Sequence, residues 1–454
     1  MRVIFLMGKY FGTDGIRGLV GEMLGSKLAN NIGRAAGSML AQDRGQGQKP
    51  RVMIVKDTRV SCDMLEAALT AGLCATGADV TLLGVLPTPA AAYLTVKSGA
   101  DMGIAISASH NPYEYNGIKM FGKDGFKLSD QQEALIEELI DGDTRDAKNA
   151  DLGRVYRDDG HWADKYVKFL VSKSEGKFAG KIAIDCSNGA ASETAQALFK
   201  AIGADFEVIA AEPDGVNINA NCGSTHTENL QALMRTGRFC VGFAFDGDAD
   251  RCLVVDEHGN VVDGDMILAV LAKDMKASGK LKGGGMVGTI VSNSGMEVYS
   301  RNNGFDFHRA DVGDRHVLEM MTETGCNLGG ESSGHMIFLD DMTTGDGQLT
   351  AVKFLNVLTA SGKSVSELVH DIPQFPQVMP GYKLSGGPEE RDAIMAHPRL
   401  LEEIKRQQEL LGDEGRVLIR PSGTEALIRV LVEAKTEELA SKIAQEFINL
   451  IKSL

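Results

Sequence analysis

One α/β unit occurs three times along this chain, and this repeat limits the fold more than any other feature. Its first segment is a short apolar run that ends in polar residues: RVMIVKDTR, KIAIDCSNG and GMVGTIVSNSG. A second segment follows as TGADVTLLGVLPTP, IGADFEVIAAEPDG and NGFDFHRADVGDR, and a third as MGIAISASHNP, VGFAFDGDADR and LGGESSGH. Apolar runs that alternate with helical stretches indicate mainly parallel sheets covered by helices.

The last part of the chain is different. Prolines in DIPQFPQVMPGY predict a linker, LEEIKRQQELL predicts a helix, and VLIRPSGTEALIRVLVEA predicts two strands around a polar loop. The final segment predicts a helix whose apolar stripe consists of Leu439, Ile443, Phe447 and Ile451. These elements indicate a smaller α+β domain.

A chain of 454 residues is too long for one core. We therefore expect three similar α/β domains with mainly parallel mixed sheets and a smaller α+β C-terminal domain around one central cleft. The expected boundaries give domains 1 to 4 as residues 1–155, 156–260, 261–372 and 373–454. In such sheets ligands bind at the carboxyl ends of strands, so the loops SASH, DGDADR and GESSGH should all face the cleft.

Charge and cysteine content exclude some classes of partner. The net charge of −15 argues against nucleic acid binding, which needs a basic surface. Seven scattered cysteines indicate reduced thiols. The apolar run near the N-terminus is too short for a signal segment or a membrane span. We expect a cytoplasmic protein with no membrane partner; a homodimer is one option that the sequence leaves open.

The DGDADR loop predicts a metal site. Asp246, Asp248 and Asp250 alternate directly after the apolar run VGFAF, so their carboxylates can converge at a strand end. Three converging carboxylates repel one another unless a cation lies among them, and oxygen ligands of this charge suit Mg²⁺. The alternative is a solvated acidic turn. A calcium loop is rejected because the glycine of the sharp turn is absent.

The SASH loop predicts nucleophilic chemistry. Ser109 is followed by His110, a pairing that can activate a hydroxyl, although a serine at a strand end can also be a helix N-cap. No GxSxG motif surrounds it, which argues against an α/β-hydrolase. The loops FGTDGIRG and RPSGTE, together with Lys119, offer partners for phosphate. With the acidic triad, these loops point to phosphoryl transfer.

The ordered set FGTDGIRG, SASHNPYEYNGIK, DGDADR, GESSGH and RPSGTEALIRV resembles the α-D-phosphohexomutase superfamily over essentially the whole chain. The stretch NINANCGSTH is most similar to its bacterial phosphoglucosamine branch. Two positions depart from the family pattern, which has proline at Ala426 and commonly glutamine at Ser332. Neither side chain carries the chemistry, so the departures bear on loop rigidity.

The resemblance implies a role for each matching residue. Ser109 would be the phosphoserine, and Asp246, Asp248 and Asp250 would bind one Mg²⁺ with a phosphoserine oxygen. Arg251 would contact the transferring phosphoryl group, Arg17 would help to hold it, and His110 and Lys119 are candidates for proton transfer. Residues that would read the sugar are Glu331 and Ser333. Residues that would clamp the phosphate not reacting are Arg420, Ser422, Gly423, Thr424 and Arg429.

The implied activity is interconversion of glucosamine 6-phosphate and glucosamine 1-phosphate through glucosamine 1,6-bisphosphate, on the route to UDP-N-acetylglucosamine and cell-wall precursors. A phosphoglucomutase or phosphomannomutase of the same fold is the nearest alternative. A non-catalytic regulator that binds sugar phosphates is disfavoured, because it would not need Ser109 and three aspartates. A Mg²⁺-dependent phosphatase is the third alternative, if water reached the phosphoserine.

Overall fold

Each repeated segment forms a strand in the computed structural model, which describes residues 8–12, 14–42, 48–422 and 427–454. In every copy the third strand, the first strand and the second strand lie side by side in that order and run parallel. In the first copy these strands are β4 (Met102–Ile106), β2 (Arg51–Lys56) and β3 (Asp79–Val85). In the second copy they are β9 (Val241–Phe245), β7 (Lys181–Asp185) and β8 (Asp205–Ile209). In the third copy they are β14 (Leu328–Gly330), β12 (Gly285–Thr289) and β13 (Asp306–Ala310).

Each third strand turns back into an antiparallel neighbour, so the sheets are mixed. These neighbours are β5 (Tyr115–Gly122), β10 (Cys252–Val255) and β15 (Met336–Phe338). The three polar loops are therefore equivalent hairpin connections, at residues 107–114, 246–251 and 331–335. Three further strands lie at sheet edges: β1 (Ile16–Leu19), β6 (Val155–Arg157) and β11 (Val261–Val262).

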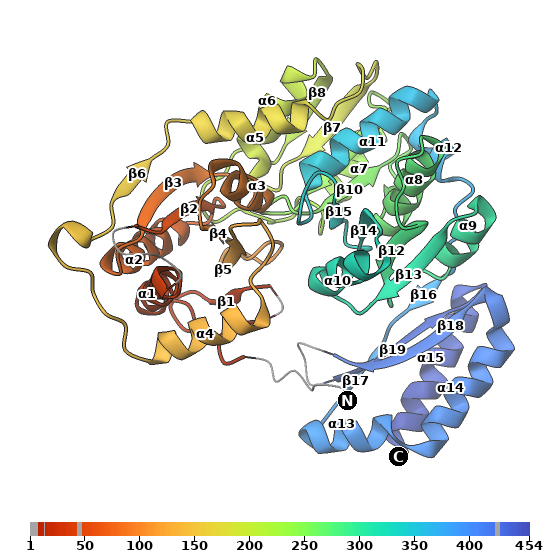
Figure 1. Ribbon diagram of the computed structural model, residues 1–454. Coiled ribbons are helices and arrows are strands. Elements are labelled where there is room, and N and C mark those ends of the chain that lie inside the picture. Colours follow the sequence, from red (N-terminus) through yellow and green to blue (C-terminus); the bar gives the residue numbers. More distant parts are fainter. Residues whose placement is uncertain (1–7, 13, 43–47, 423–426) are drawn as a thin grey trace.

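Helices cover the three sheets (Figure 1), and β4 and β9 are buried along their whole length. Ser129 and Gln132 form a capping box at the start of α4. The first domain contains α1 (Ser26–Gln42), α2 (Cys62–Ala75), α3 (Thr88–Ser98) and α4 (Asp130–Asp141), with the short η1 (Asn149–Asp151) after them. The second contains α5 (His161–Val171), α6 (Ala191–Ala201) and α7 (Glu228–Met234). The third contains α8 (Gly264–Ala277), α9 (Gly295–Asn303), α10 (Asp314–Thr324), α11 (Gly347–Ser361) and α12 (Val365–Val369).

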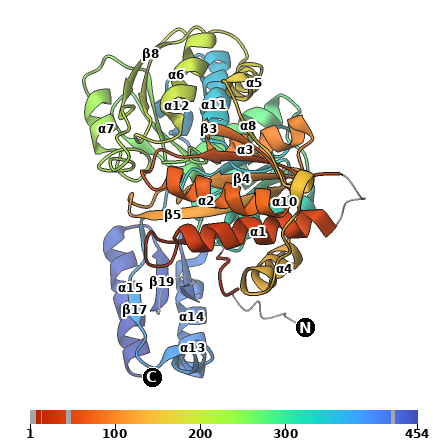
Figure 2. The ribbon, with the colours of Figure 1, turned by 90° about the vertical axis from the view of Figure 1, so that its left-hand side faces the viewer.

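The C-terminal domain is built on an antiparallel sheet, and Figure 2 shows it beside the other three. Its strands are β16 (Gln377–Val378), β17 (Gly381–Lys383), β18 (Arg416–Pro421) and β19 (Leu427–Glu433). Its helices are α13 (Gly387–Met395), α14 (Pro398–Leu411), η2 (Gly412–Glu414) and α15 (Glu437–Lys452). The fold therefore confirms three α/β domains and a smaller fourth one, whereas the exact domain boundaries stay a prediction.

One detail of the last helix was predicted wrongly. Leu439 is 40% exposed and does not belong to the buried stripe. The buried stripe consists of Ala440, Ile443, Ala444, Phe447, Ile448 and Ile451. Its two alanines were not part of the predicted stripe, which counted only large apolar residues.

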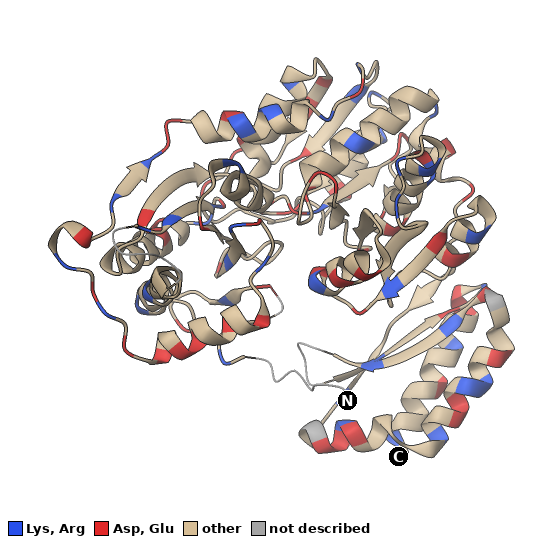
Figure 3. Ribbon diagram, in the orientation of Figure 1, with Lys and Arg blue, Asp and Glu red and all other residues tan. Residues whose placement is uncertain are grey.

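Charged residues of both signs are scattered over the four domains (Figure 3). Within the described part of the chain, no helix has the length and apolar character that a bilayer span requires.

Candidate active site

Ser109 lies fully buried in the loop after β4, and its backbone is in the left-handed region with a φ of 53°. This conformation costs a non-glycine residue about 1–2 kcal/mol, so neighbouring groups must hold it. The Ser109 N–H donates to Ser107 Oγ at 2.9 Å. The Ser109 carbonyl accepts from Arg59 Nη2 and from Asn219 Nδ2, each at 2.9 Å. Both backbone groups of Ser109 are thus fixed.

Arg59 and Asp57 form a buried pair that the sequence analysis missed. Arg59 Nε lies 2.9 Å from Asp57 Oδ2, and Ser107 Oγ donates to the same oxygen at 2.6 Å. Arg59 Nη1 donates to the Pro112 carbonyl, and Arg59 Nη2 donates to the Asn111 carbonyl. The sequence did contain a signal for this pair. The polar residues DTR directly follow β2, in the same way that polar residues follow the other strands of the repeat.

Asn219 brings the second domain to the same loop. Its Nδ2 also donates to the Asn111 carbonyl at 3.0 Å, and its Oδ1 accepts from Ser187 Oγ at 2.6 Å. Asn219 belongs to NINANCGSTH, which the sequence analysis used only as a mark of substrate class. In the structure this stretch supports Ser109, while His226 at its end is exposed.

The predicted metal ligands converge. Asp246, Asp248 and Asp250 are buried, with ligand atoms within 4.8 Å of one another. Burial, and then the charges of Asp250 and Asp248, hold the pKa of Asp246 well above its usual value. Ser109 Oγ donates to Asp246 Oδ2 at 2.5 Å, and Thr88 Oγ1 to Asp248 Oδ2 at 2.6 Å.

Two oxygens of this triad, Asp248 Oδ1 and Asp250 Oδ1, are buried and accept no hydrogen bond from any residue that the structure describes. Buried carboxylate oxygens left in this way are costly. A cation among the three carboxylates would satisfy them. Oxygen ligands on a short loop at a strand end fit Mg²⁺, so the donor set suits the expected metal.

Lys119 offsets part of the triad's charge. Its Nζ lies 2.8 Å from Asp248 Oδ2, 3.3 Å from Asp250 Oδ2 and 3.0 Å from Asp14 Oδ2. Burial lowers the pKa of Lys119, but these carboxylates outweigh it and raise the pKa well above the usual value. Asp14 also pairs with Arg17. The motif FGTDGIRG was recognised in the sequence, but Asp14 was not singled out as an organiser of these cations.

His110 and Arg251 lie on the other side of the hydroxyl. His110 Nδ1 is 3.4 Å from Ser109 Oγ and 3.1 Å from Arg251 Nη1. A guanidinium can only donate, so this nitrogen carries the lone pair. Burial, and then the charges of Arg251 and Arg17, lower the pKa of His110 to about 4. His110 is therefore neutral near pH 7.

The third loop reaches the same centre. Glu331 Oε1 accepts from the Gly313 N–H at 3.1 Å, and the buried Ser333 Oγ has no hydrogen-bond partner among the described residues. His335, which the sequence analysis missed, has Nδ1 3.7 Å from Asp250 Oδ1 and Nε2 3.5 Å from Asp314 Oδ2. Burial lowers the pKa of His335, but these carboxylates outweigh it and raise the pKa to about 9.

Two of the predicted phosphate-clamp residues are directly opposite each other. Arg420 on β18 is in register with Arg429 on β19, which places both side chains on one face of the hairpin. Burial, and then the charge of Arg429, lower the pKa of Arg420. The Ser422 N–H donates to the Leu427 carbonyl at 2.9 Å. Gly423, Thr424 and Ala426 lie outside the described residues.

Family comparisons cover the chain in order. Four domains of the phosphoglucomutase/phosphomannomutase family match this chain. They are alpha/beta/alpha domain I at residues 8–146, domain II at 164–259, domain III at 263–375 and the C-terminal domain at 387–450.

Curated relatives match over nearly their full length. A phosphoglucosamine mutase of Caldicellulosiruptor bescii is 48% identical over 453 residues, covering 98% of this chain and 99% of that protein. A phosphoglucosamine mutase of Shouchella clausii is 46% identical over 449 residues, with the same coverage.

Solved structures show the same fold. A phosphoglucomutase/phosphomannomutase family protein from Burkholderia thailandensis is 28% identical, with a TM-score of 0.80 and coverage of 97% of both chains. An Aspergillus fumigatus N-acetylphosphoglucosamine mutase, solved in complex with GlcNAc-6P and magnesium, is 18% identical, with a TM-score of 0.68 and coverage of 98% of this chain and 96% of that one.

Proposed function

The chain belongs to the phosphoglucosamine mutases of the α-D-phosphohexomutase superfamily, and from this membership we propose that it interconverts glucosamine 6-phosphate and glucosamine 1-phosphate through a phosphorylated Ser109. The observation that carries this proposal is the contact of Ser109 Oγ with Asp246 Oδ2 at 2.5 Å, at the edge of a buried carboxylate triad. A hydroxyl in this place can hold a phosphoryl group beside a metal site.

The reaction has two transfers. The bond between the phosphorus and Ser109 Oγ breaks as the free hydroxyl oxygen of the sugar bonds to the phosphorus, which yields glucosamine 1,6-bisphosphate. The hydroxyl's proton passes to the proton acceptor of the site, and Ser109 Oγ takes up a proton from the donor. The bisphosphate turns over, and its other phosphoryl group returns to Ser109. Positioning and charge stabilisation provide most of the catalysis in reactions of this type.

The charges of the site suit this chemistry. Mg²⁺ bound by Asp246, Asp248 and Asp250 would neutralise charge on the transferring phosphoryl group. Arg251 and Arg17 supply further positive charge beside Ser109, since both have the triad carboxylates as electrostatic neighbours.

Proton transfer divides between two groups of opposite character. Lys119 is an ammonium among its carboxylates before the reaction, so we assign it the role of a proton donor. His110 is neutral with its Nδ1 lone pair 3.4 Å from Ser109 Oγ, so we assign it the role of a proton acceptor. The first transfer leaves His110 protonated and Lys119 neutral. In the second transfer His110 donates and Lys119 accepts, so both groups return to their starting proton states.

The sugar is read by the third loop, and its distal phosphate by the fourth domain. The Glu331 carboxylate and the Ser333 hydroxyl, which has no hydrogen-bond partner among the described residues, can bond sugar hydroxyls. Arg420 and Arg429 are two cations that an anion between them would stabilise, with Ser422, Gly423 and Thr424 completing the expected clamp. Because either end of the bisphosphate must use this clamp, it has to accept both orientations.

The amino sugar is favoured over its neutral relatives. The 2-ammonium group carries a charge that a carboxylate such as Glu331 can pair with, whereas a 2-hydroxyl gains less, and sites built to pair a polar group discriminate strongly.

Mg²⁺ and glucosamine 1,6-bisphosphate are the proposed cofactor and activator. A cytoplasmic location is proposed on the sequence, in which seven scattered cysteines are typical of a reducing compartment.

A coupled assay tests this function. The kcat/KM values for glucosamine, glucose and mannose 6-phosphates are compared, each with its own 1,6-bisphosphate and Mg²⁺. We expect the highest value for glucosamine 6-phosphate. Preference for glucose or mannose would indicate the neighbouring branch, release of inorganic phosphate would indicate a phosphatase, and binding without turnover would indicate a regulator.

A further inference from the structure

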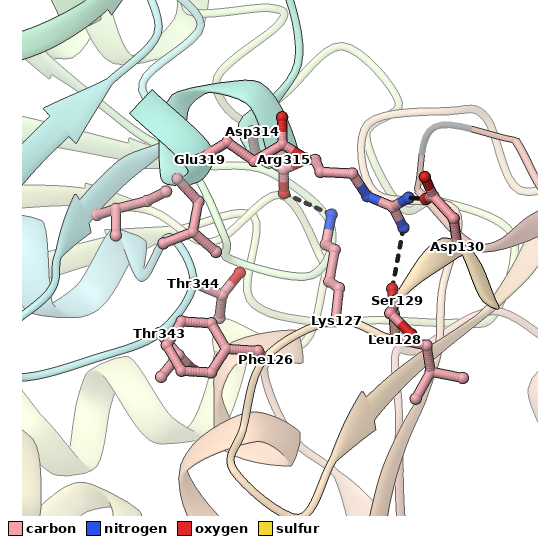
Figure 4. Close-up of a pocket in the computed structure, with 12 residues that line it drawn as sticks. Phe126, Lys127, Leu128, Ser129, Asp130, Asp314, Arg315, Glu319, Thr343 and Thr344 are labelled. Carbon is pink, nitrogen blue, oxygen red and sulfur yellow. Dashed lines mark hydrogen bonds and ion pairs between the residues drawn. The ribbon is translucent and has the colours of Figure 1, made fainter. Parts of the chain in front are cut away.

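Lys127 joins the first domain to the third beside the active site. It lies between β5 and α4, and its Nζ forms ion pairs with Asp14 of the first domain and with Asp314 at the start of α10. Figure 4 shows the Lys127 side chain directed at Asp314 across the two domains. The Lys127 side chain is only 16% exposed.

Both carboxylates that pair with Lys127 also contact residues of the proposed active site. Asp14 pairs with Arg17 and, at 3.0 Å, with Lys119. Asp314 Oδ2 lies 3.5 Å from His335 Nε2. Lys127 therefore completes a chain of close contacts from Lys119 in the first domain to His335 in the third.

The ammonium group also keeps two like charges together. Burial raises the pKa of both Asp14 and Asp314, but neighbouring cations outweigh it. Lys119 and Lys127 lower the pKa of Asp14, and Lys127 lowers the pKa of Asp314 against the like charge of Asp14. Partly buried carboxylates in this arrangement, 19% and 18% exposed, need the cation between them. Without it, the halves of the site that belong to the first and third domains would move apart.

We propose that Lys127 is a positioning residue for phosphoryl transfer, which sets the place of Arg17 and Lys119 relative to His335 by holding Asp14 and Asp314 together. The role of Lys127 in turnover rests on the proposed function. Its effect on the geometry does not, and can be measured separately.

A cavity beside Lys127 makes this role testable by chemical rescue. The cavity is about 290 Å³, and its wall includes Phe126, Leu128, Asp314, Arg315 and Thr343 (Figure 4). Removing the Lys127 side chain beyond Cβ enlarges it by the volume of propylammonium. A small amine can then enter and restore the charge between the two carboxylates.

Arg315 provides a matched control at the same interface. It pairs with Asp130 and, at 2.5 Å, with Glu133, and it donates to the Leu128 carbonyl at 3.2 Å. These partners belong to the first domain, and none of them is an ion-pair partner of Asp14, Arg17, Lys119 or His335 within the described part of the chain. Arg315→Ala therefore weakens the domain contact without removing the charge that Lys127 supplies.

The experiment compares Lys127→Ala, Lys127→Arg and Arg315→Ala. We expect Lys127→Ala to lower kcat about 100-fold with little change in KM, the size of effect that a displacement of about 1 Å produces. Propylammonium should restore at least a tenth of the lost rate, and 1-propanol should not. Lys127→Arg should retain more activity than Lys127→Ala, and Arg315→Ala should stay within about threefold of the parent kcat. An unchanged kcat in Lys127→Ala, an equal loss in Arg315→Ala, or failure of propylammonium to rescue would overturn the proposal.

A second readout needs no turnover. The imidazole resonances of His335, followed by NMR, should shift in Lys127→Ala, return with propylammonium and stay unchanged in Arg315→Ala. If the parent enzyme lacked mutase activity but these shifts occurred, the proposed function would fail while the positioning role held. If the His335 resonances did not respond to Lys127→Ala, the positioning role would fail whatever the activity.

Discussion

Ser109 Oγ lies 2.5 Å from Asp246 Oδ2, although the two residues are 137 positions apart in the chain. The contact joins the hairpin loop after β4 to the equivalent loop after β9. The repeat therefore brings the hydroxyl of one copy to the carboxylates of another. Neither domain contains this arrangement alone.

The acidic triad should be essential for metal binding and turnover. Asp248→Asn removes a charge from a site in which one oxygen of Asp248 accepts no hydrogen bond from the described residues. We expect weaker Mg²⁺ binding by titration calorimetry and a fall in kcat of orders of magnitude, because phosphoryl transfer depends on the metal's charge. Asp256→Asn is the control, since that aspartate lies outside the triad on the following turn. Full activity of Asp248→Asn in the presence of chelator would favour the acidic-turn alternative.

The support of Ser109 by Asn219 should matter for rate more than for substrate affinity. Asn219→Ala removes two hydrogen bonds to the loop, worth about 0.5–1.5 kcal/mol each. We expect kcat to fall about 10- to 100-fold with KM nearly constant, as measured by steady-state kinetics. Thr225→Ala, an exposed change in the same stretch, should leave kcat unaltered. A change confined to KM would argue that the stretch acts on the sugar instead.

The Arg420 clamp should contribute to binding of the distal phosphate. Arg420→Ala removes a charged contact worth about 1.5–3 kcal/mol, so kcat/KM should fall about 10- to 150-fold. Ser109 should remain phosphorylated and Mg²⁺ should still bind, because the clamp lies in another domain. Kinetics identical to those of the parent would show that the fourth domain has a different role.

Stability should depend on pH through Asp185, a buried carboxyl at the end of β7. Burial raises its pKa from 3.8 to about 6, against the backbone N–H groups of Gly223 and Ser187. The folded state thus keeps the proton up to a higher pH than the unfolded state does. The free energy of unfolding therefore falls as pH rises from about 4 to about 6. Asparagine does not ionise, so the free energy of unfolding of Asp185→Asn should not fall in this way.

Denaturant unfolding checks this sign. Between pH 4.5 and pH 7.5, the free energy of unfolding of the variant should gain about 2 kcal/mol relative to the parent. A constant difference between the two proteins across this range would show that Asp185 is not responsible.

Much of the fold could be predicted because each repeated segment is decided locally. The apolar runs from Arg51, Lys181 and Gly285 form strands whose burial follows their own pattern. Asp246, Asp248 and Asp250 could also be predicted as a group, since the alternation of carboxylates on one loop is visible in the sequence.

The remaining site residues could not be predicted in this way, because their roles depend on contacts between domains. Asn219 acts through a carbonyl of the first domain, and His335 through a carboxylate of the second. Lys127 looks like an ordinary surface lysine until Asp314 is placed beside it. Local patterns carry no information about which charges meet across an interface.

Phosphopeptide mapping during a single turnover tests the central claim most directly. The protein is first incubated with glucosamine 1,6-bisphosphate and Mg²⁺, then mixed with a stoichiometric amount of glucosamine 6-phosphate and quenched over time. We predict phosphate on Ser109 and not on Ser107, its transfer to the sugar at a rate no slower than kcat, and neither phosphate nor mutase activity in Ser109→Ala. Phosphate on another residue, phosphate on Ser109 that stays through turnover, or full activity of Ser109→Ala would contradict the account.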